Sequence, residues 1–529
     1  MSDSERDATF QLPLTIGVTG HRDLPEGSRQ SLEAAVTEVL EGVRRKAPAT
    51  PFLVLSGLAE GADRVVARLA LEKFGATLIA VLPTSVEQFR EDFKSADSKA
   101  EFDRLLATAK QVVFANGPPP AAVSADQRRA GYAAVGQWIA LHSHLLLALW
   151  DGAEARGRGG TAEVVRAKLK GRYDMIASDQ LLRYDEGGAV AHILTPRPGS
   201  TQGADAGRVR WLYAEPTTIG ARGGQHRHNA LLAAFNHLNR LLDADRRTAT
   251  RWAETAGASS NTSIQALKGA AGTYARQFQS RTQISVQYLA VATIVAALAS
   301  GLEFALGKTA STVLGVVAIA TACAIWAYAK RGGWQRWYTD YRALAEACRV
   351  QAVWSDCGLG KCVADHYHPV QANAVPWIRR AVRTAGLLDL PGKDTPAPSD
   401  EAVVRAATAW LDEQIDFFLG HRGVVHRYRQ QARKFIAISL GCLGTGLAIA
   451  AGTSLQAYLV FMAYGDLQRS YAVSGHLFGI AKEESQQAIA ARDERRLKAL
   501  VYELGRAALV ENVSWVLTRR QRGVKPPLR

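Results

Sequence analysis

The segment GVTGHRD, near the amino terminus, combines glycines with side chains that can donate hydrogen bonds to an anion. It contains Gly17, Thr19, Gly20, His21 and Arg22 and follows an apolar run typical of a buried strand. Glycine allows a ligand to approach the backbone, and the carboxyl ends of parallel strands favour anionic ligands. We expect these five residues to bind ligand, although His21 or Arg22 could instead be a structural cap.

A second segment, SGLAEGADRVVA, has the same pattern of small residues between a strand and a helix. Ser56 and Gly57 end the expected strand, and Gly61 and Asp63 open the helix. Small residues would let a phosphate reach the helix terminus, where the helix dipole favours negative charge. Asp63 could accept a hydrogen bond from a ribose hydroxyl, or it could cap the helix. Both interpretations of Asp63 remain open.

The third segment, LWDGAEARGRGGTAEVV, places a Gly-Gly-Thr turn at an expected helix start. Backbone amides in such a turn can hold a phosphate. The candidate ligand-binding residues here are Asp151, Gly152, Arg158, Gly159, Gly160 and Thr161. Glu163 follows in the first helical turn, where it either faces the same pocket or only favours the helix dipole.

Alternating strands and helices must position these three segments. Apolar runs predict strands at residues 14–19, 52–56, 77–82, 111–115, 145–150 and 189–194. Amphipathic segments predict helices at residues 27–45, 61–74, 85–108, 125–143 and 161–170. This alternation is typical of an α/β, Rossmann-like domain with a parallel sheet. We place the domain at residues 11–245, with a Gly- and Thr-rich stretch at 199–224 and a closing helix at 229–242.

The remainder of the chain predicts an all-α, membrane-spanning region. After a helical connector at 246–284, the apolar segments 286–306 and 310–329 are each long enough to cross a bilayer and are joined by a very short link. We therefore expect a transmembrane helical hairpin at 285–330. The alternative is a buried hairpin in a large soluble core. A cytoplasmic helical segment at 331–390, a linker at 391–400 and a helical region at 401–529 complete the chain.

Residues 435–464 carry no charge and predict one or two further membrane segments, interrupted at Gly452. Basic residues border the apolar segments, which is the positive-inside pattern. Together with an amino terminus that has no apolar signal segment, this predicts a cytoplasmic-membrane protein whose amino-terminal domain and carboxyl terminus lie in the cytoplasm.

The formal net charge of +15 over 529 residues permits contact with either nucleic acid or anionic lipid. Because the basic residues flank apolar segments and no nucleic-acid-binding motif accompanies them, we expect the lipid bilayer as a partner and no nucleic acid. Five cysteines do not form a disulfide framework. Cys357, Cys362, His366 and His368 fit no strong zinc template, so we expect no metal and no cofactor.

Taken together, the three glycine-containing segments, with Leu82-Pro83, resemble the SLOG superfamily, which includes the Lonely Guy enzymes and DNA-processing protein A. The resemblance covers about residues 11–245. It implies a Rossmannoid domain that either hydrolyses the N-glycosidic bond of nucleotides or senses nucleotide-derived signals. Residues 275–525, with the segments WYTDYRALAEACRVQ and ALVENVSW, resemble SLATT membrane effectors. That resemblance implies a pore-forming, oligomeric effector in bacterial antiviral defence.

Glu163 departs from the Lonely Guy pattern, in which the glutamate lies three positions after the threonine. Here it follows Thr161 by two positions, a shift of about 100° around a helix. This departure favours ligand sensing by a homo-oligomeric effector over catalysis. The alternative is a membrane-tethered nucleoside 5′-monophosphate N-glycosidase in which Glu163 is catalytic. A third possibility is a scaffold that binds no nucleotide.

Overall fold

The computed structural model describes residues 10–120, 124–154, 159–173, 187–197, 205–215, 223–244, 262–301, 307–390, 396–421, 423–443 and 464–521. The chain divides into two compact units, Met1–Arg251 (unit 1) and Trp252–Arg529 (unit 2). The division separates a sheet-containing unit from a helical one.

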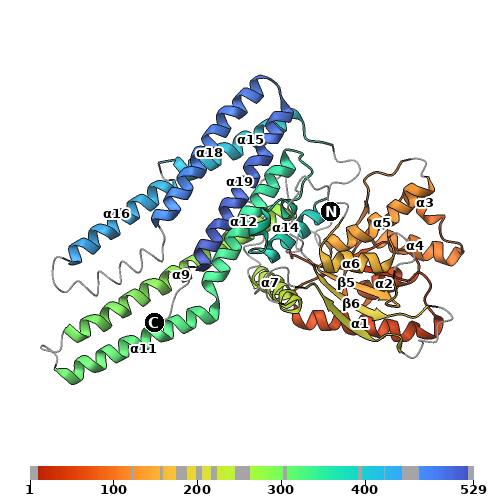
Figure 1. The fold of residues 1–529 in the computed structure, drawn as a ribbon, viewed down its shortest axis with the longest axis horizontal. Coiled ribbons are helices and arrows are strands. Elements are labelled where there is room, and N and C mark those ends of the chain that lie inside the picture. The colour runs from red at the N-terminus through yellow and green to blue at the C-terminus, as the bar shows by residue number, and fades with distance from the viewer. Residues whose placement is uncertain are drawn as a thin grey trace. The chain divides into compact units, whose positions relative to one another are not determined.

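Within the described residues of unit 1, seven strands form one sheet in the order β4-β3-β2-β1-β5-β6-β7 (Figure 1). All neighbouring strands are parallel except β6 and β7, which pair antiparallel. The strands are β1 (Leu14–Gly20), β2 (Phe52–Ser56), β3 (Thr77–Leu82), β4 (Gln111–Phe114), β5 (Leu145–Trp150), β6 (Ala189–Leu194) and β7 (Val209–Tyr213). The expected α/β class with a Rossmann-like parallel sheet is confirmed.

Helices cover both faces of this sheet. They are α1 (Arg29–Lys46), α2 (Ala62–Phe74), α3 (Val86–Arg90), α4 (Ala96–Thr108), α5 (Ala125–His142), α6 (Thr161–Lys170) and α7 (Gly224–Ala244). Leu14, Ile16 and Val18 of β1 belong to a core cluster with buried residues of α1, α2 and α4. Gly17 instead faces α5. Side chains alternate across a strand, so α5 lies on the opposite face from α1.

Two expectations for unit 1 were wrong in detail. The helix expected at 85–108 is two helices, because the Ser95 side chain accepts a hydrogen bond from the Ser98 N–H (3.1 Å) and so caps a new helix, α4. The rings of Phe89, Phe93 and Phe102 pack together across this break. Strand β7 was not expected, since it lies in the Gly- and Thr-rich stretch.

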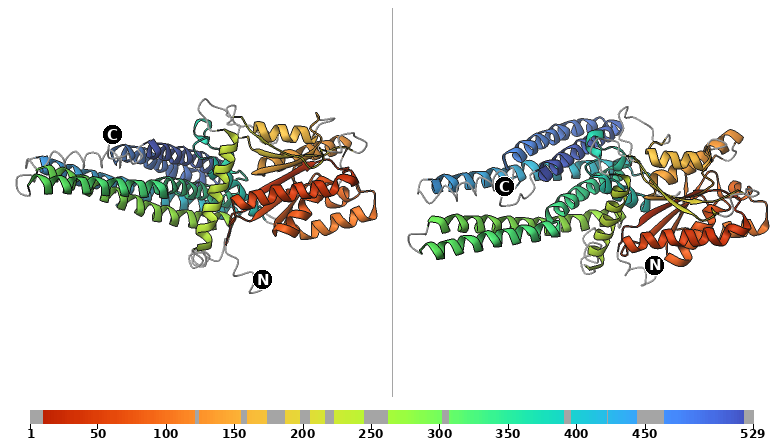
Figure 2. Two further views of the ribbon diagram at one scale, coloured as in Figure 1. Left: turned by 90° about the horizontal axis from the view of Figure 1, so that it is seen from below. Right: turned by 60° about the horizontal axis from the view of Figure 1, so that its bottom comes forward.

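All secondary-structure elements in the described residues of unit 2 are helices. Its longer helices are α9 (Ser263–Gly301), α11 (Lys308–Gly332), α12 (Trp334–Asp356), α14 (Pro376–Leu388), α15 (Asp400–Leu419), α16 (Val424–Leu443), α18 (Tyr464–Ala490) and α19 (Glu494–Gln521), with the short α13 (Pro369–Ala372). Helices α9 and α11 run side by side as a hairpin, and α12 packs against both α9 and α19 (Figures 1 and 2). Helix α9 passes residue 284 without a break, so the expected connector and the first apolar segment share one helix.

The α9–α11 hairpin exposes much of its apolar surface. Val313, Val316, Val317 and Ile319 of α11 and Val291 of α9 are all exposed. Among the described residues, one run of helix, Lys308–Asp356, is long and apolar enough to cross a membrane, and only 17% of its most apolar window is buried. Residues 302–306 and 444–463, with Glu303 and most of the segment expected at 435–464, lie outside the described residues.

Candidate ligand-binding site

Strand β1 lies at the point where the order of the sheet reverses. It pairs with β2 on one side and with β5 on the other. The chain leaves β1 toward β2 and leaves β5 toward β6, so the two connections diverge. In open α/β sheets, ligands bind in the crevice that such divergence creates outside the carboxyl ends of the strands. We call the loops after β1, β2 and β5 the switch-point loops.

Direct hydrogen bonds join the loops after β1 and β5. The Asp151 N–H donates to His21 Nε2 (3.1 Å), and the His21 N–H donates to the Leu149 carbonyl (3.0 Å). A ring nitrogen that accepts a hydrogen bond carries no proton, so this geometry fits neutral His21. His21 Nε2 also lies 3.5 Å from Asp151 Oδ1, a contact that becomes an ion pair when the ring is protonated.

The Asp151 carboxylate is held by groups of the chain itself. Arg197 Nε donates to its Oδ2 (2.6 Å), and the Ala153 N–H donates to its Oδ1 (3.1 Å). Burial raises the pKa of Asp151, but these two hydrogen bonds and the charges of a protonated His21 and of Arg197 outweigh it and hold the pKa below its ordinary value. Arg197 was not predicted as a site residue. Its position just after β6 was the only sequence signal.

The loop after β2 folds back on Asp63. The Ala59 N–H donates to Asp63 Oδ2 (3.3 Å), and Ser56 Oγ donates to the Asp63 carbonyl (3.2 Å). A Cβ added at Gly57 would lie 2.9 Å from Asp63 Oδ2. These contacts hold the loop that precedes α2, whose N-cap residue is Gly61, so they are not the helix cap that the sequence offered as one interpretation of Asp63. Gly57 provides the space for its carboxyl group.

Burial raises the pKa of Asp63 to about 7, even though hydrogen bonds from Ala59 and Gly57 and the charges of Arg22 and Arg64 oppose the shift. Folded unit 1 therefore binds the proton more tightly than the unfolded chain does. The stability that this provides is present below pH 4 or so and is lost as the pH rises through about 7.

We predict that Asp63→Asn stabilises unit 1 more at about pH 8 than at about pH 5, because asparagine removes the buried charge and keeps an acceptor. After allowance for the partial exposure of Asp63, the gain in the free energy of unfolding at about pH 8 is roughly 2–3 kcal/mol, or about 5–10 °C in the unfolding midpoint. Thermal unfolding of the wild type and the variant at both pH values measures it. The exposed Asp205→Asn change is the control, and an equal shift at both pH values would contradict the prediction.

Two glycines bring the loops after β1 and β2 into contact. A Cβ added at Gly61, whose φ is +79°, would lie 2.2 Å from the Arg22 carbonyl oxygen. One added at Gly20 would lie 2.4 Å from the Ala62 Cβ. The Ala62 N–H at the start of α2 donates to the His21 carbonyl (3.0 Å). Close packing of the chain on itself therefore requires glycine at both positions.

The Gly-Gly-Thr turn precedes α6, as expected. Gly159 has a φ of +81°, Gly160 is the N-cap residue and Thr161 begins the helix. The Glu163 carboxylate accepts a hydrogen bond from the Gly159 N–H (2.6 Å). The Glu163 carboxylate thus takes up one of the backbone N–H groups that were expected to bind a phosphate. Arg158 lies outside the described residues.

Helix α5 contacts all three switch-point loops. The Arg22 guanidinium lies 4.8 Å from the centre of the Tyr132 ring, and a Cβ at Gly159 would lie 2.8 Å from the Ala133 Cα. A Cβ at Gly57 would lie 3.3 Å from Val135. The amino-terminal half of α5 therefore sets the spacing between loops that are far apart in the sequence. No motif in the sequence indicated this role.

Tyr132 links Arg22 to a further pair of charged groups. Its hydroxyl donates to Asp92, which also forms an ion pair with Arg128. Burial and the hydrogen bond to Asp92 raise the pKa of Tyr132, and Arg22 opposes the shift. Arg22 itself is exposed. It is the cation of the loop after β1 that solvent, and hence an anionic ligand, can reach.

Three further residues were expected at the site. One of them packs against α5, and the contacts of the structure assign no role to the other two. A Cβ added at Gly17 would lie 2.7 Å from Ile139 Cγ2, so Gly17 admits α5 against β1. Thr19 is half-buried within β1. Gly152 has a φ of +81° in the turn after β5. Among the described residues, no group of three or more His, Cys, Asp or Glu could hold a metal ion.

Comparisons with known proteins add no family assignment. No protein-family model, no curated protein and no solved structure matches this chain. The functional proposal therefore depends on the geometry of the switch-point loops and on the exposed surface of unit 2.

Proposed function

We propose that unit 1 binds a nucleotide-derived signal at the switch-point loops and that binding controls membrane helices in unit 2. The observation that carries the first half is the convergence of three loops at the reversal point of a parallel sheet, with exposed Arg22 among them. Nucleotide phosphates bind at such points in open α/β sheets. The resemblance to SLOG domains leads to the same expectation.

The side chains of the loops suit an anionic group, such as a phosphate, on an otherwise polar molecule. Arg22 offers a guanidinium with five N–H donors, which matches the oxygens of a phosphate. Asp63, whose pKa is raised to about 7, carries a full negative charge on only part of the molecules at neutral pH. It therefore repels a phosphate less than an ordinary aspartate would. His21 adds no negative charge in either protonation state.

Sensing is a better interpretation of the loops than hydrolysis. A glutamate that stabilises the developing positive charge of ribose must face the substrate. The Glu163 carboxylate instead accepts a hydrogen bond from the Gly159 amide of its own loop. This contact supports the helix-dipole alternative for Glu163 and leaves the N-glycosidase hypothesis without a group assigned to catalysis.

The second half of the proposal places the α9–α11 hairpin in a bilayer. A core helix of a soluble protein would be mostly buried, whereas only 17% of the apolar window in the run Lys308–Asp356 is buried. Exposed apolar surface of this extent marks a contact with lipid or protein. A pore would require several copies of the chain, so we propose a homo-oligomeric effector of the cytoplasmic membrane. Coupling requires that the ligand bind two states with different affinity.

A panel of nucleoside monophosphates, cyclic nucleotides and dinucleotides, added to the full chain in detergent, tests the proposal. We expect at least one to raise the unfolding midpoint of unit 1, because a ligand at 100 times its Kd stabilises a fold by about 2.7 kcal/mol. Release of free base in the same samples would support the N-glycosidase instead. No shift with any nucleotide would leave unit 1 as a scaffold.

A further inference from the structure

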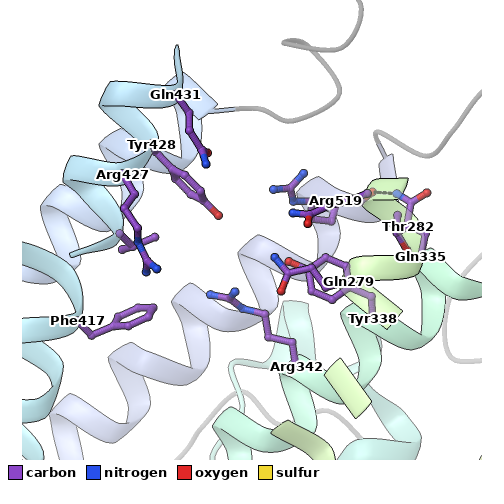
Figure 3. Close-up of a pocket in the computed structure, with 12 residues that line it drawn as sticks. Gln279, Thr282, Gln335, Tyr338, Arg342, Phe417, Arg427, Tyr428, Gln431 and Arg519 are labelled. Atoms are coloured by element: carbon purple, nitrogen blue, oxygen red, sulfur yellow. Dashed lines mark hydrogen bonds between the residues drawn. The ribbon is translucent and has the colours of Figure 1, made fainter. Parts of the chain in front are cut away.

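A pocket in unit 2, remote in sequence from the switch-point loops, lies among α9, α12, α16 and α19. Its volume is about 250 Å³, and three arginines line it, namely Arg342, Arg427 and Arg519 (Figure 3). Tyr338 and Tyr428 also line it, and no Asp or Glu is among its lining residues. We call it the arginine pocket.

Arg342 is fixed in the wall of the arginine pocket. Its Nη2 donates to the Tyr471 hydroxyl (3.2 Å), and its guanidinium lies 4.5 Å from the centre of the Trp515 ring. Figure 3 shows Arg342 and Arg427 extending toward the same space from opposite helices. Within the described part of the chain, neither arginine forms an ion pair with a carboxylate. Two cations thus converge without a bound counter-charge.

Glu511 is the acidic residue whose charge acts on the pKa of Arg342. Burial raises the pKa of Glu511 to about 7, although Arg342 lowers it. Glu511 therefore balances the arginines only in part near neutral pH. Holding several arginines together is costly unless an anion compensates them. The arrangement fits a site for an anion with several acceptor oxygens, which guanidinium groups bind well.

The pocket also lies beside the ends of the apolar helices. Gln279 and Thr282 of α9 line it just before the exposed apolar surface that begins at Ile284. Gln335 of α12 lines it just after the end of α11. If the α9–α11 hairpin spans a bilayer, the pocket lies at the depth of the lipid phosphates. Its volume is below the roughly 300–1,000 Å³ of pockets that enclose drug-sized ligands, and so suits a headgroup.

We propose that the arginine pocket binds a phosphate group, supplied by the headgroup of an anionic lipid. The phosphate chemistry follows from the arginines alone and goes beyond nucleotide sensing. The choice of a lipid rests on the proposed membrane insertion of the hairpin. A free phosphate has the same chemistry and is the alternative source.

The test compares two variants of α16 in the full chain. Arg427→Gln removes an arginine that lines the pocket, and Arg429→Gln removes an exposed arginine of the same helix that does not. Both lose one positive charge, so general attraction to anionic lipid falls equally. Because both side chains are exposed, neither change should prevent folding. Arg342→Gln serves as a second pocket variant.

The full chain in neutral detergent is titrated with phosphatidylglycerol, phosphatidylcholine or inorganic phosphate, and thermal stability is followed. We expect phosphatidylglycerol to stabilise the wild type and Arg429→Gln, and Arg427→Gln to need roughly tenfold more lipid. Equal responses of the two variants, or no stabilisation by either anion, would overturn the proposal. Stabilisation by inorganic phosphate at the concentrations effective for lipid would overturn the lipid source. Neither result depends on nucleotide binding.

Discussion

Replacing Ile319 by arginine should release the protein from membranes, whereas replacing Val510 by arginine should not. The two side chains are almost equally exposed, at 40% and 39%. In a soluble protein both would be surface changes worth less than about 0.5 kcal/mol. Ile319, however, lies at the middle of the proposed span, where an arginine costs about 2.5–3.5 kcal/mol. Adding Val316→Arg should roughly double this cost.

Membrane fractionation after expression, followed by extraction with alkaline carbonate, measures the effect. We expect the wild type and Val510→Arg to stay in the membrane fraction, Ile319→Arg to be depleted from it, and the Ile319→Arg/Val316→Arg double variant to be lost from it. If the wild type and all three variants are found in the soluble fraction, the hairpin is a surface feature of a soluble protein and the effector proposal fails.

Replacing Arg22 by glutamine should abolish most of the nucleotide affinity. A hydrogen bond to a charged group contributes about 1.5–3 kcal/mol, which corresponds to roughly a 10- to 100-fold loss. Because Arg22 is exposed and its ring contact with Tyr132 is peripheral, the fold should remain intact. The thermal shift produced by the active nucleotide measures the loss.

Arg45→Gln is the matched control for this change. Arg45 is also exposed, but it lies in the last turn of α1, before β2 begins and thus at the opposite edge of the sheet. Both variants lose one positive charge from unit 1. Equal losses of affinity would mean that the nucleotide responds to net charge and that the switch-point loops do not bind it.

The strands of the sheet were predictable because most are uninterrupted apolar runs. β2, β3, β5 and β6 match their expected bounds, and β1 and β4 differ by one residue. Strand β7 was missed because its sequence, VRWLY, is short and follows a glycine-rich stretch. The break between α3 and α4 was missed because residues 91–95 are compatible with a helix. The aromatic cluster that packs across the break involves residues from both sides.

The candidate site was predictable in location but not in its contacts. A strand end followed by glycines indicated the edge of the sheet at which the switch-point loops lie. The sequence did not indicate that Gly61 and Gly20 serve close packing between loops, because the atoms they would meet belong to other segments. Arg197 lies 46 residues from its partner Asp151, and no local pattern records such a pair. Tyr132 was missed for the same reason.

The roles of Asp63 and Glu163 depended on side-chain directions that spacing alone cannot give. Each had two open interpretations. Both carboxyl groups accept a backbone N–H of their own loop, from Ala59 and Gly159 respectively. The helix dipole favours acidic residues in a first helical turn, where both of them lie.

The most direct test of the coupling between the two units is dye release from liposomes that contain the full chain. We predict that the nucleotide that stabilises unit 1 triggers release by the wild type and by Arg45→Gln, and that Arg22→Gln responds only at roughly 10- to 100-fold higher nucleotide concentration. Release that is the same with and without nucleotide, or no release by the wild type under any condition, would contradict the account.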